Sequence, residues 1–221
     1  MYQFVFDSES ANVLGGYFAS SRTITLLKLM TLISALFVLD ASEIFMRQHS
    51  RHLLEYPIMV ALTTFFMLLL VSANHIMSTF LSLVGFSLGL YVLILYDANR
   101  RPSREAGLKY YYLSTLSSGF ILYGILLIYT LTGTGNYDEL FLLFNTKVHF
   151  QENLLLRTAL LLILAGFFFK LSAFPGHLWA ADVYEGSPAP VTAFFMLPVK
   201  IVVLGAFIRL FSVALAPLAA S

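Results

Sequence analysis

The sequence has 221 residues, of which 59% are hydrophobic and only 11% are charged, and its mean hydropathy is +0.82. Soluble domains carry about 25% charged residues, so this composition excludes an ordinary soluble protein. The net charge of +1 provides no field that would attract nucleic acid, and the lack of cysteine excludes disulfides, thiolate metal sites and iron–sulfur ligation by this chain.

The apolar residues fall in runs of the length that crosses a bilayer, about 20 residues. They predict an all-α, polytopic transmembrane helix bundle with six spans, at residues 23–42, 57–73, 76–96, 109–132, 154–174 and 190–213. Residues 1–22 are too polar and too broken by glycine to span, and we expect a surface or interfacial lead-in there. Residues 137–152 mix Leu and Phe with charges and predict a short amphipathic element at the interface, and residues 214–221 form a short tail.

Basic residues concentrate in the loops that follow the first and third spans: Arg47, Arg51, Arg100, Arg101, Arg104 and Lys109. If six spans alternate, both loops lie on one side of the membrane, together with the bend at residues 175–189. Basic loops face the cytoplasm in such proteins, so we expect that side to be the cytoplasm, or the matrix in a mitochondrion.

Three lysines lie within predicted spans, where a charge costs about 2.5 to 3.5 kcal/mol on insertion scales and usually marks an ion or proton path. Lys28 is close to the start of its helix and can extend its ammonium group to the interface. Lys170 precedes Pro175, which breaks helices, and both the same extension and a proton site fit it. Lys200 lies in the middle of its span, two residues after Pro198, and a functional role is favoured.

Two lysines beside one hydrated cavity suit proton transfer. Desolvation makes a lysine release its proton more readily, and each ammonium group disfavours the charge of the other. A redox centre would need different residues, and the five histidines show no paired, haem-like placement within spans. The stretch "LTGTGNY" follows a helix and not a strand, so it does not predict a phosphate-binding loop.

The stretch "FFFKLSAFPGHLWAADVYEGSPAPVTAFF", followed by "LPVKIVV", resembles the antiporter-like membrane subunits of respiratory complex I, NADH dehydrogenase (ubiquinone), and within that family its subunit 2 branch. The stretches "EYPIMVALTTFFMLLLVSANHIMSTFLSL" and "LYVLILYDANRRPSREAGLKYYYLSTLSSGFILYGILLIYTLTGTGNY" resemble it too, so the similarity covers about residues 30–213 in the family's order. By this resemblance, residues 23–213 are the N-terminal half of an antiporter-like inverted-repeat module, with a discontinuous helix near Pro175.

The resemblance also implies site residues. The family uses a lysine in a discontinuous helix and a second lysine in the next helix, which match Lys170 and Lys200. The family's bend "P-F-H-x-W-x-P-D-V-Y-x-G-x-P" corresponds to Pro175, Gly176, His177, Trp179, Ala181, Asp182, Val183, Tyr184, Gly186 and Pro188. Lys170 and Lys200 are therefore the expected proton relay, with His177 as a weaker candidate.

Two departures from the family pattern matter. Gly176 and Ala181 replace a Phe and a Pro, which loosens the bend. More seriously, Val84 stands where the family has a membrane-buried Glu that pairs with the first lysine. Nearby hydroxyls are the serines at 78, 82, 87, 114, 117 and 118. Hydroxyls hold water but do not balance a charge. Either a carboxylate therefore arrives from another chain, or Lys170 is mostly neutral and the relay is broken.

The resemblance implies a subunit of proton-translocating NADH:ubiquinone reductase that has no redox site of its own. NADH, flavin, iron–sulfur clusters and quinone would be bound by other subunits, and no metal or cofactor by this chain. The partners would be other membrane-arm subunits, lipids and a separate polypeptide that supplies the missing second half. A split or reduced subunit suits a mitochondrial inner membrane better than the alternative, a bacterial plasma membrane.

Two other functions stay open. One is a structural scaffold that has lost pumping, which Val84 permits. The other is a subunit of a multi-subunit cation/proton antiporter.

Overall fold

The computed structural model describes residues 11–48, 55–97, 99–146, 153–174 and 176–215. Six helical stretches in these residues are long and apolar enough to cross a membrane, which confirms the predicted polytopic all-α bundle. The helices that form them are α2 (Arg22–Gln48), α3 (Glu55–Ser72), α4 (Ile76–Ile94), α5 (Arg101–Thr132), α7 (Leu154–Leu171), and α9 (Ala189–Phe194) with α10 (Lys200–Arg209). The shorter elements are β1 (Ala11–Val13), β2 (Phe18–Ser20), α6 (Tyr137–Thr146) and α8 (Leu178–Gly186).

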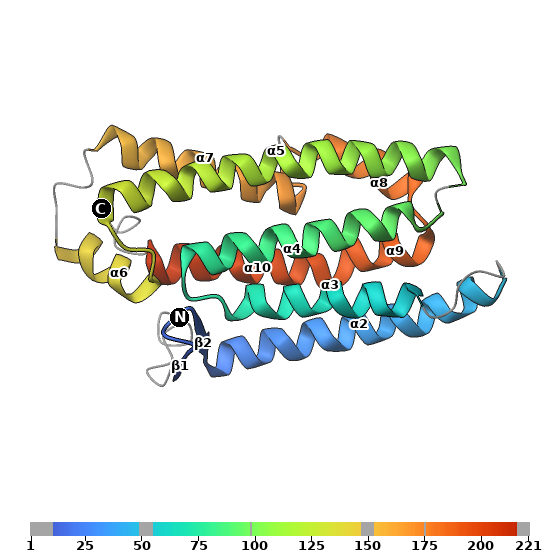
Figure 1. Cartoon of the computed structure of the whole chain (residues 1–221), viewed down its shortest axis with the longest axis horizontal. Helices are drawn as coiled ribbons and strands as arrows, with labels where there is room; N and C mark the ends of the chain where they lie inside the picture. Colours follow the sequence, from blue (N-terminus) through green and yellow to red (C-terminus); the bar gives the residue numbers. More distant parts are fainter. Residues whose placement is uncertain (1–10, 49–54, 98, 147–152, 175, 216–221) are drawn as a thin grey trace.

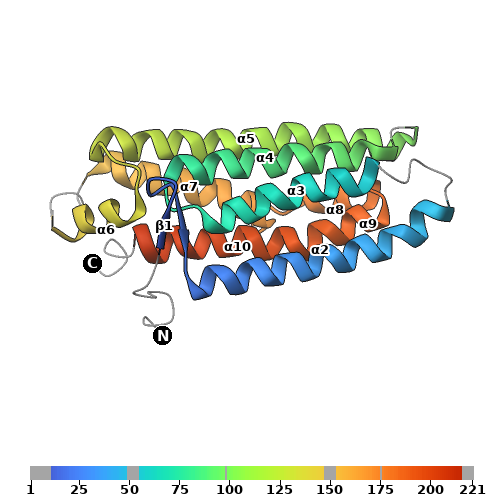
Figure 2. The same ribbon diagram turned by 60° about the horizontal axis from the view of Figure 1, so that its bottom comes forward.

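The long helices lie side by side along one axis and form an elongated bundle (Figure 1). α4 is the most enclosed of them, with 56% of its most apolar stretch buried, whereas only 22% of that of α2 is buried. α2 forms an outer edge of the bundle (Figure 2). Several of its Leu and Phe side chains, such as Leu36 and Phe37, are exposed and suit lipid. The interior between α4 and its neighbours is therefore where a buried polar site is to be sought.

α3 and α4 approach each other closely because glycines on α4 face larger side chains on α3. A Cβ at Gly89 would lie 2.3 Å from Thr63 Oγ1, and a Cβ at Gly85 would lie 2.3 Å from Phe66 Cδ1. Leu83, Phe86 and Leu90 of α4 are fully buried. These side chains pack the core beside the site described next.

α5 is the longest helix and spans about 48 Å at 1.5 Å per residue. It begins with Pro at a first-turn position, where the missing N–H is not needed, and ends at Gly133 with φ +73°. α7 and α8 pack on it in series, so that α7 lies along one half of α5 and α8 along the other (Figure 1). The close contacts are Gly166 on the backbone of Ser117 and Gly186 on the backbone of Pro102.

This arrangement corrects one boundary that the sequence predicts. The expected fifth span, residues 154–174, ends at Leu171, about midway along α5, and part of the expected bend, residues 175–189, forms α8. α8 is held to α5 by a 2.8 Å ion pair between Lys109 and Asp182 and by a 3.0 Å hydrogen bond from Ser103 to the Gly186 carbonyl. The chain thus continues along α5 after the break.

At the end of the bundle opposite to α8 lie the short elements β1, β2 and α6 (Figure 1). β1 and β2 form an antiparallel hairpin, and β2 bridges to Ala73 in the loop between α3 and α4. α6 buries Tyr137, Leu140 and Phe144 on one face, as expected for an amphipathic element. Of the predicted lead-in and tail, residues 1–10 and 216–221 lie outside the described part.

The last span is interrupted twice by wide, π-helical turns. The first, Phe195–Val199, contains Pro198 and directly precedes Lys200, and the second, Leu210–Ala214, directly follows Arg209. Proline lacks an N–H and disturbs the regular helix, which explains the first turn. Such turns are frequent at functional positions, and here each lies next to a basic residue within the membrane-spanning helix.

Candidate functional site

α7 ends through its own capping geometry and before the proline that the sequence suggested as the breaker. Ser172 adopts a left-handed conformation with φ +55° and donates its N–H to the Phe169 carbonyl, while Ala173 donates to the Phe168 carbonyl. These bonds close the helix at Leu171. Pro175 lies outside the described residues.

Lys170, in the last turn of α7, is buried in the bundle with 7% of its surface exposed. Its ammonium group donates to Ser87 Oγ on α4 at 2.6 Å and to Ser114 Oγ on α5 at 3.0 Å. The ammonium group also lies 5.6 Å from the centre of the Phe86 ring, within the range of a cation–π interaction. Three helices therefore meet at this one side chain.

Among the described residues, Lys170 forms no ion pair with a carboxylate. Its polar partners are the two hydroxyls, and Val84, one turn before Ser87 on α4, offers only methyl groups. Of the six serines near this level, the structure brings Ser87 and Ser114 to Lys170, while Ser117 donates to the Gly166 carbonyl at 2.9 Å. The carboxylate that the family pattern calls for is therefore not supplied by the described part of this chain.

Lys200 reaches the same helix break from the next span. Its ammonium group donates to the Leu171 carbonyl at 2.6 Å and to Ser172 Oγ at 2.8 Å, and its side chain is half-buried. The carbonyl is free to accept because the helix ends there. The ammonium group of Lys200 thus binds the helix end that directly follows Lys170.

An aromatic wall closes the site on the side of α8. Trp179 donates its indole N–H to the Phe169 carbonyl at 3.1 Å and stacks on the Phe169 ring at 5.7 Å. Between this wall and Lys170 remains a void of about 10 Å³, whose lining includes Val199, the residue before Lys200. This is about the smallest void that holds one water molecule.

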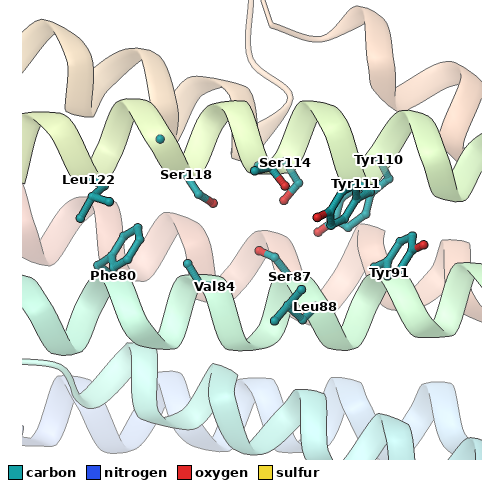
Figure 3. Close-up of a pocket in the computed structure, with 12 residues that line it drawn as sticks. Phe80, Val84, Ser87, Leu88, Tyr91, Tyr110, Tyr111, Ser114, Ser118 and Leu122 are labelled. Carbon is teal, nitrogen blue, oxygen red and sulfur yellow. The ribbon is translucent and has the colours of Figure 1, made fainter.

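A larger pocket of about 260 Å³ lies between α4 and α5 (Figure 3). Figure 3 shows Ser87 and Val84 on α4 facing Ser114 and Ser118 on α5 across this pocket. We call it the α4–α5 pocket; its floor is made of small residues, Val84, Ser87, Ser114, Thr115, Ser118 and Gly119. Two of these residues, Ser87 and Ser114, are the serines that hold Lys170.

The third predicted site residue, His177, is not part of this cluster. It precedes α8, is exposed, and its ring lies 5.9 Å from that of Phe174. Lys28, the lysine expected to extend toward the interface, is half-buried on α2. No group of three or more potential metal-ligating side chains occurs in the part of the chain that the structure describes.

A second buried cation was not predicted from the sequence. Arg209 is 9% exposed, and its Nη1 donates to the carbonyls of Val71 at 2.6 Å and Ala73 at 2.9 Å. A signal is present in the sequence, since Arg209 interrupts an apolar run. Its burial is nearly as complete as that of Lys170.

A histidine at the same end serves as a helix cap. His75 precedes α4, and its Nδ1 accepts the N–H of Met77 at 3.1 Å. Burial lowers the pKa of His75 below its ordinary value, and the nearby Glu139 carboxylate partly opposes this shift. The neutral ring that the cap requires is therefore favoured.

The fold and this cluster of lysines define a polytopic membrane protein of the antiporter-like class. Residues 73–220 match the family model described as NADH:quinone oxidoreductase/Mrp antiporter, transmembrane. The chain belongs to this family, which confirms the resemblance drawn from its sequence.

Curated relatives support the same assignment. NADH-quinone oxidoreductase subunit N of Rhodospirillum rubrum is 38% identical over 88% of this chain and 40% of its own length. The subunit N of Bartonella bacilliformis is 40% identical over 88% of this chain and 39% of its own length. The chain therefore spans about two fifths of the length of the curated relatives it matches.

Solved structures agree in fold. A chain of respiratory complex I from Thermus thermophilus matches 91% of this chain and 42% of its own length, with a TM-score of 0.73 and 31% identity. A chain of the Mrp complex from Dietzia sp. matches 90% of this chain and 36% of its own length, with a TM-score of 0.73 and 23% identity. The second likeness concerns the fold alone.

Proposed function

We propose that this chain is a non-redox subunit in the membrane arm of a proton-translocating NADH:quinone oxidoreductase, where Lys170 and Lys200 form a proton half-channel. The relatives named above are subunits of that enzyme, which supports this function over a cation/proton antiporter. NADH, flavin, iron–sulfur clusters and quinone would then be bound by other subunits.

The observation that carries the proposal is the meeting of both lysines at one helix break. Lys170 is in the last turn of α7, and the ammonium group of Lys200 binds the next two residues, Leu171 and Ser172. A lysine, unlike an arginine, exchanges its proton under physiological conditions once it is desolvated. A proton that leaves one ammonium group lowers the repulsion on the other, so the two charges respond to each other.

Hydroxyls give the proton a route to Lys170. Ser87 and Ser114 contact both the ammonium group and the α4–α5 pocket, and a hydroxyl accepts one hydrogen bond while donating another. On the far side, Lys170 and Val199 line the small void, and the Ser172 hydroxyl accepts a hydrogen bond from Lys200. The order pocket, Lys170, Lys200 is the path we propose.

The partners belong to the same proposal. Leu204 and Ile208 on α10 are 47% and 46% exposed, and Lys200 on the same helix is only half-buried. A second antiporter-like half, which the resemblance implies, would cover this face together with other membrane-arm subunits and lipid. The named relatives are bacterial, which fits a bacterial plasma membrane; the mitochondrial inner membrane stays a prediction.

The test is the number of protons moved per electron by the intact enzyme. Lys200→Ala should lower this ratio while assembly stays largely normal, and Lys170→Met should lower the ratio of the complexes that assemble. Lys28→Ala removes another membrane lysine outside the cluster and should leave the ratio unchanged. An unchanged ratio in both site variants, with normal assembly, would refute the relay.

One observation favours a second function. Because no described carboxylate pairs with Lys170, this half could serve as a structural scaffold of the membrane arm without conducting protons. In that case the Lys200→Ala complex would assemble, transfer electrons and pump with the stoichiometry of the native complex. The same measurement therefore separates the two functions.

A further inference from the structure

The α4–α5 pocket opens on the outer face of the bundle. Leu88 and Tyr111, which line it, are 51% and 41% exposed. Thr115 and Gly119 on its floor are also exposed, and a Cβ added at Gly119 would meet nothing within 4 Å. The pocket is thus a groove into which something outside this chain can settle.

Only the hydroxyls of Ser87 and Ser114 separate this groove from the buried ammonium group of Lys170. Ser87 and Ser114 line the pocket and accept hydrogen bonds from Lys170 at 2.6 and 3.0 Å. Ser118, one turn from Ser114, points into the same groove (Figure 3). An anion placed here would lie close to the ammonium group and could accept hydrogen bonds from the hydroxyls.

The buried charge requires such an anion whenever Lys170 is protonated. Hydroxyls satisfy its donors but leave its charge uncompensated, and an uncompensated charge in the membrane interior is strongly disfavoured. The described residues of this chain offer no carboxylate within ion-pair distance. Charge complementarity therefore points to an acidic group that enters from outside through the groove.

The depth of the site determines what can carry that acid. Ser114 and Ser118 lie near the middle of the 32-residue helix α5. The charged headgroup of a lipid stays about 15 Å from the bilayer centre, because the hydrocarbon core is about 30 Å thick. A side chain on a transmembrane helix reaches the middle, and small residues four apart, such as Thr115 and Gly119, allow close helix contact.

We propose that the α4–α5 pocket is the docking groove for a transmembrane helix of a partner subunit, whose Asp or Glu at the level of Val84 and Ser118 balances the charge of Lys170. This inference rests on the proposed function, since it names the counter-charge of the relay. The partner helix lies over Thr115 and Gly119, with Leu88 and Tyr111 beside it.

Site-specific photocrosslinking in the assembled complex tests what occupies the groove. A diazirine-bearing amino acid replaces Leu88 at the rim of the groove, and in a control it replaces Leu36, 59% exposed on the outer face of α2. The adduct at position 88 should map by mass spectrometry to one helix of one partner subunit, with an Asp or Glu within about one turn of the crosslinked residue. Adducts with lipid only, or with a helix that lacks an acid at this level, would overturn the proposal.

Two variants test the cause of docking. Gly119→Leu adds a bulky side chain at a position where an added Cβ meets nothing within 4 Å. Lys170→Met removes the charge at similar volume. Each variant should lower the adduct at position 88 by about tenfold. Lys28→Met should leave the yield unchanged. An unchanged yield with Gly119→Leu would contradict a docked helix, and an unchanged yield with Lys170→Met would contradict charge balance.

The outcome is independent of pumping. If the proton-to-electron ratio is insensitive to Lys200→Ala but the acidic helix is crosslinked at position 88, the relay fails and the docking groove stands. If the ratio falls but only lipid is captured, the relay stands and the docking groove fails.

Discussion

Two cations are buried to a similar extent in this molecule, yet their surroundings differ. Lys170 is 7% exposed and is held by hydroxyls of Ser87 and Ser114, which come from two different helices. Arg209 is 9% exposed and is held by the main-chain carbonyls of Val71 and Ala73. Both environments accept hydrogen bonds from the cation. Only the hydroxyls around Lys170 can change the direction of their hydrogen bonds.

The surroundings of Arg209 are a rigid junction. Thr79 and Tyr137 share a 2.6 Å hydrogen bond, and Asn74 donates to the Asp138 carboxylate at 3.2 Å, so that α4 and the loop before it are tied to α6. The carbonyls at the end of α3 also carry the negative end of that helix dipole, which suits a permanent positive charge. We refer to this cluster as the Arg209 junction.

The surroundings of Lys170 are adaptable instead. Hydroxyls can reverse the direction of their hydrogen bonds, whereas carbonyls only accept. Pockets adjoin Lys170 and its serines, and a lysine gives up its proton far more readily than an arginine. The comparison teaches that burial of a cation does not by itself indicate a relay; the type of cation and the freedom of its partners do.

The largest effect is expected at the Arg209 junction. Arg209→Met leaves two carbonyls without their donor and should destabilise the fold by about 2 to 5 kcal/mol. The amount of this chain retained in membranes and the Tm of the purified complex should both fall markedly. Catalysis per assembled complex should change little.

Arg209→Lys is the matched control for that prediction. It keeps the charge and part of the donor capacity, so it should recover much of the Tm. Equal loss in both variants would mean that the planar guanidinium is essential, and normal assembly of Arg209→Met would contradict the structural role.

A smaller loss is expected when α7 is pushed away from α5. A Cβ at Gly166 would lie 2.3 Å from Ile121 Cγ1 and 2.9 Å from the Ser117 carbonyl oxygen. Gly166→Ala should therefore cost about 1 to 3 kcal/mol and lengthen the contact between Lys170 and Ser114. We expect a lower Tm together with a lower proton-to-electron ratio.

Gly119→Ala on the exposed side of α5 is the control, because nothing lies within 4 Å of the added Cβ. It should change the free energy of unfolding by less than about 1 kcal/mol. A similar loss in both glycine variants would show that helix packing at Gly166 is not what positions Lys170.

Sequence patterns predicted the six spans and the two lysines because apolar runs and isolated charges are local features. The predicted break near Pro175 is confirmed, since α7 ends at Leu171 and α8 begins at Leu178, but the left-handed conformation of Ser172 that closes α7 could not be predicted. The partners of Lys170 come from α4 and α5, 83 and 56 residues away, and such pairings depend on packing. The burial of Arg209 was not predicted, because its partners are main-chain carbonyls, which every residue has and which no sequence pattern reveals.

The hydroxyls of the relay should affect transport more than stability. Ser114→Ala and Ser87→Ala each remove one hydrogen bond to a charged group, about 1.5 to 3 kcal/mol when that charge is present. We expect slower proton transport with little change in Tm, because the alanine variants favour the neutral lysine. Ser117→Ala, which loses a bond to the Gly166 carbonyl instead, should lower the Tm and leave transport per complex unchanged.

The smallest effect concerns His75, the cap of α4. Because burial lowers the pKa of His75, the cap is fully present above the ordinary histidine pKa of 6.5 and is lost as pH falls below that value. Protonation of Nδ1 removes the acceptor for the Met77 N–H, at a cost of about 0.5 to 1 kcal/mol. Between about pH 7.5 and 5.5, protection of the Met77 amide in hydrogen–deuterium exchange, corrected for the intrinsic rate, should therefore fall by about two- to fivefold.

His75→Asn keeps a capping acceptor that does not titrate. In this variant the protection of the Met77 amide should not depend on pH in this range. If the native protein and the His75→Asn variant lose protection equally, the cap is not what responds to pH, and the junction at this end opens for another reason.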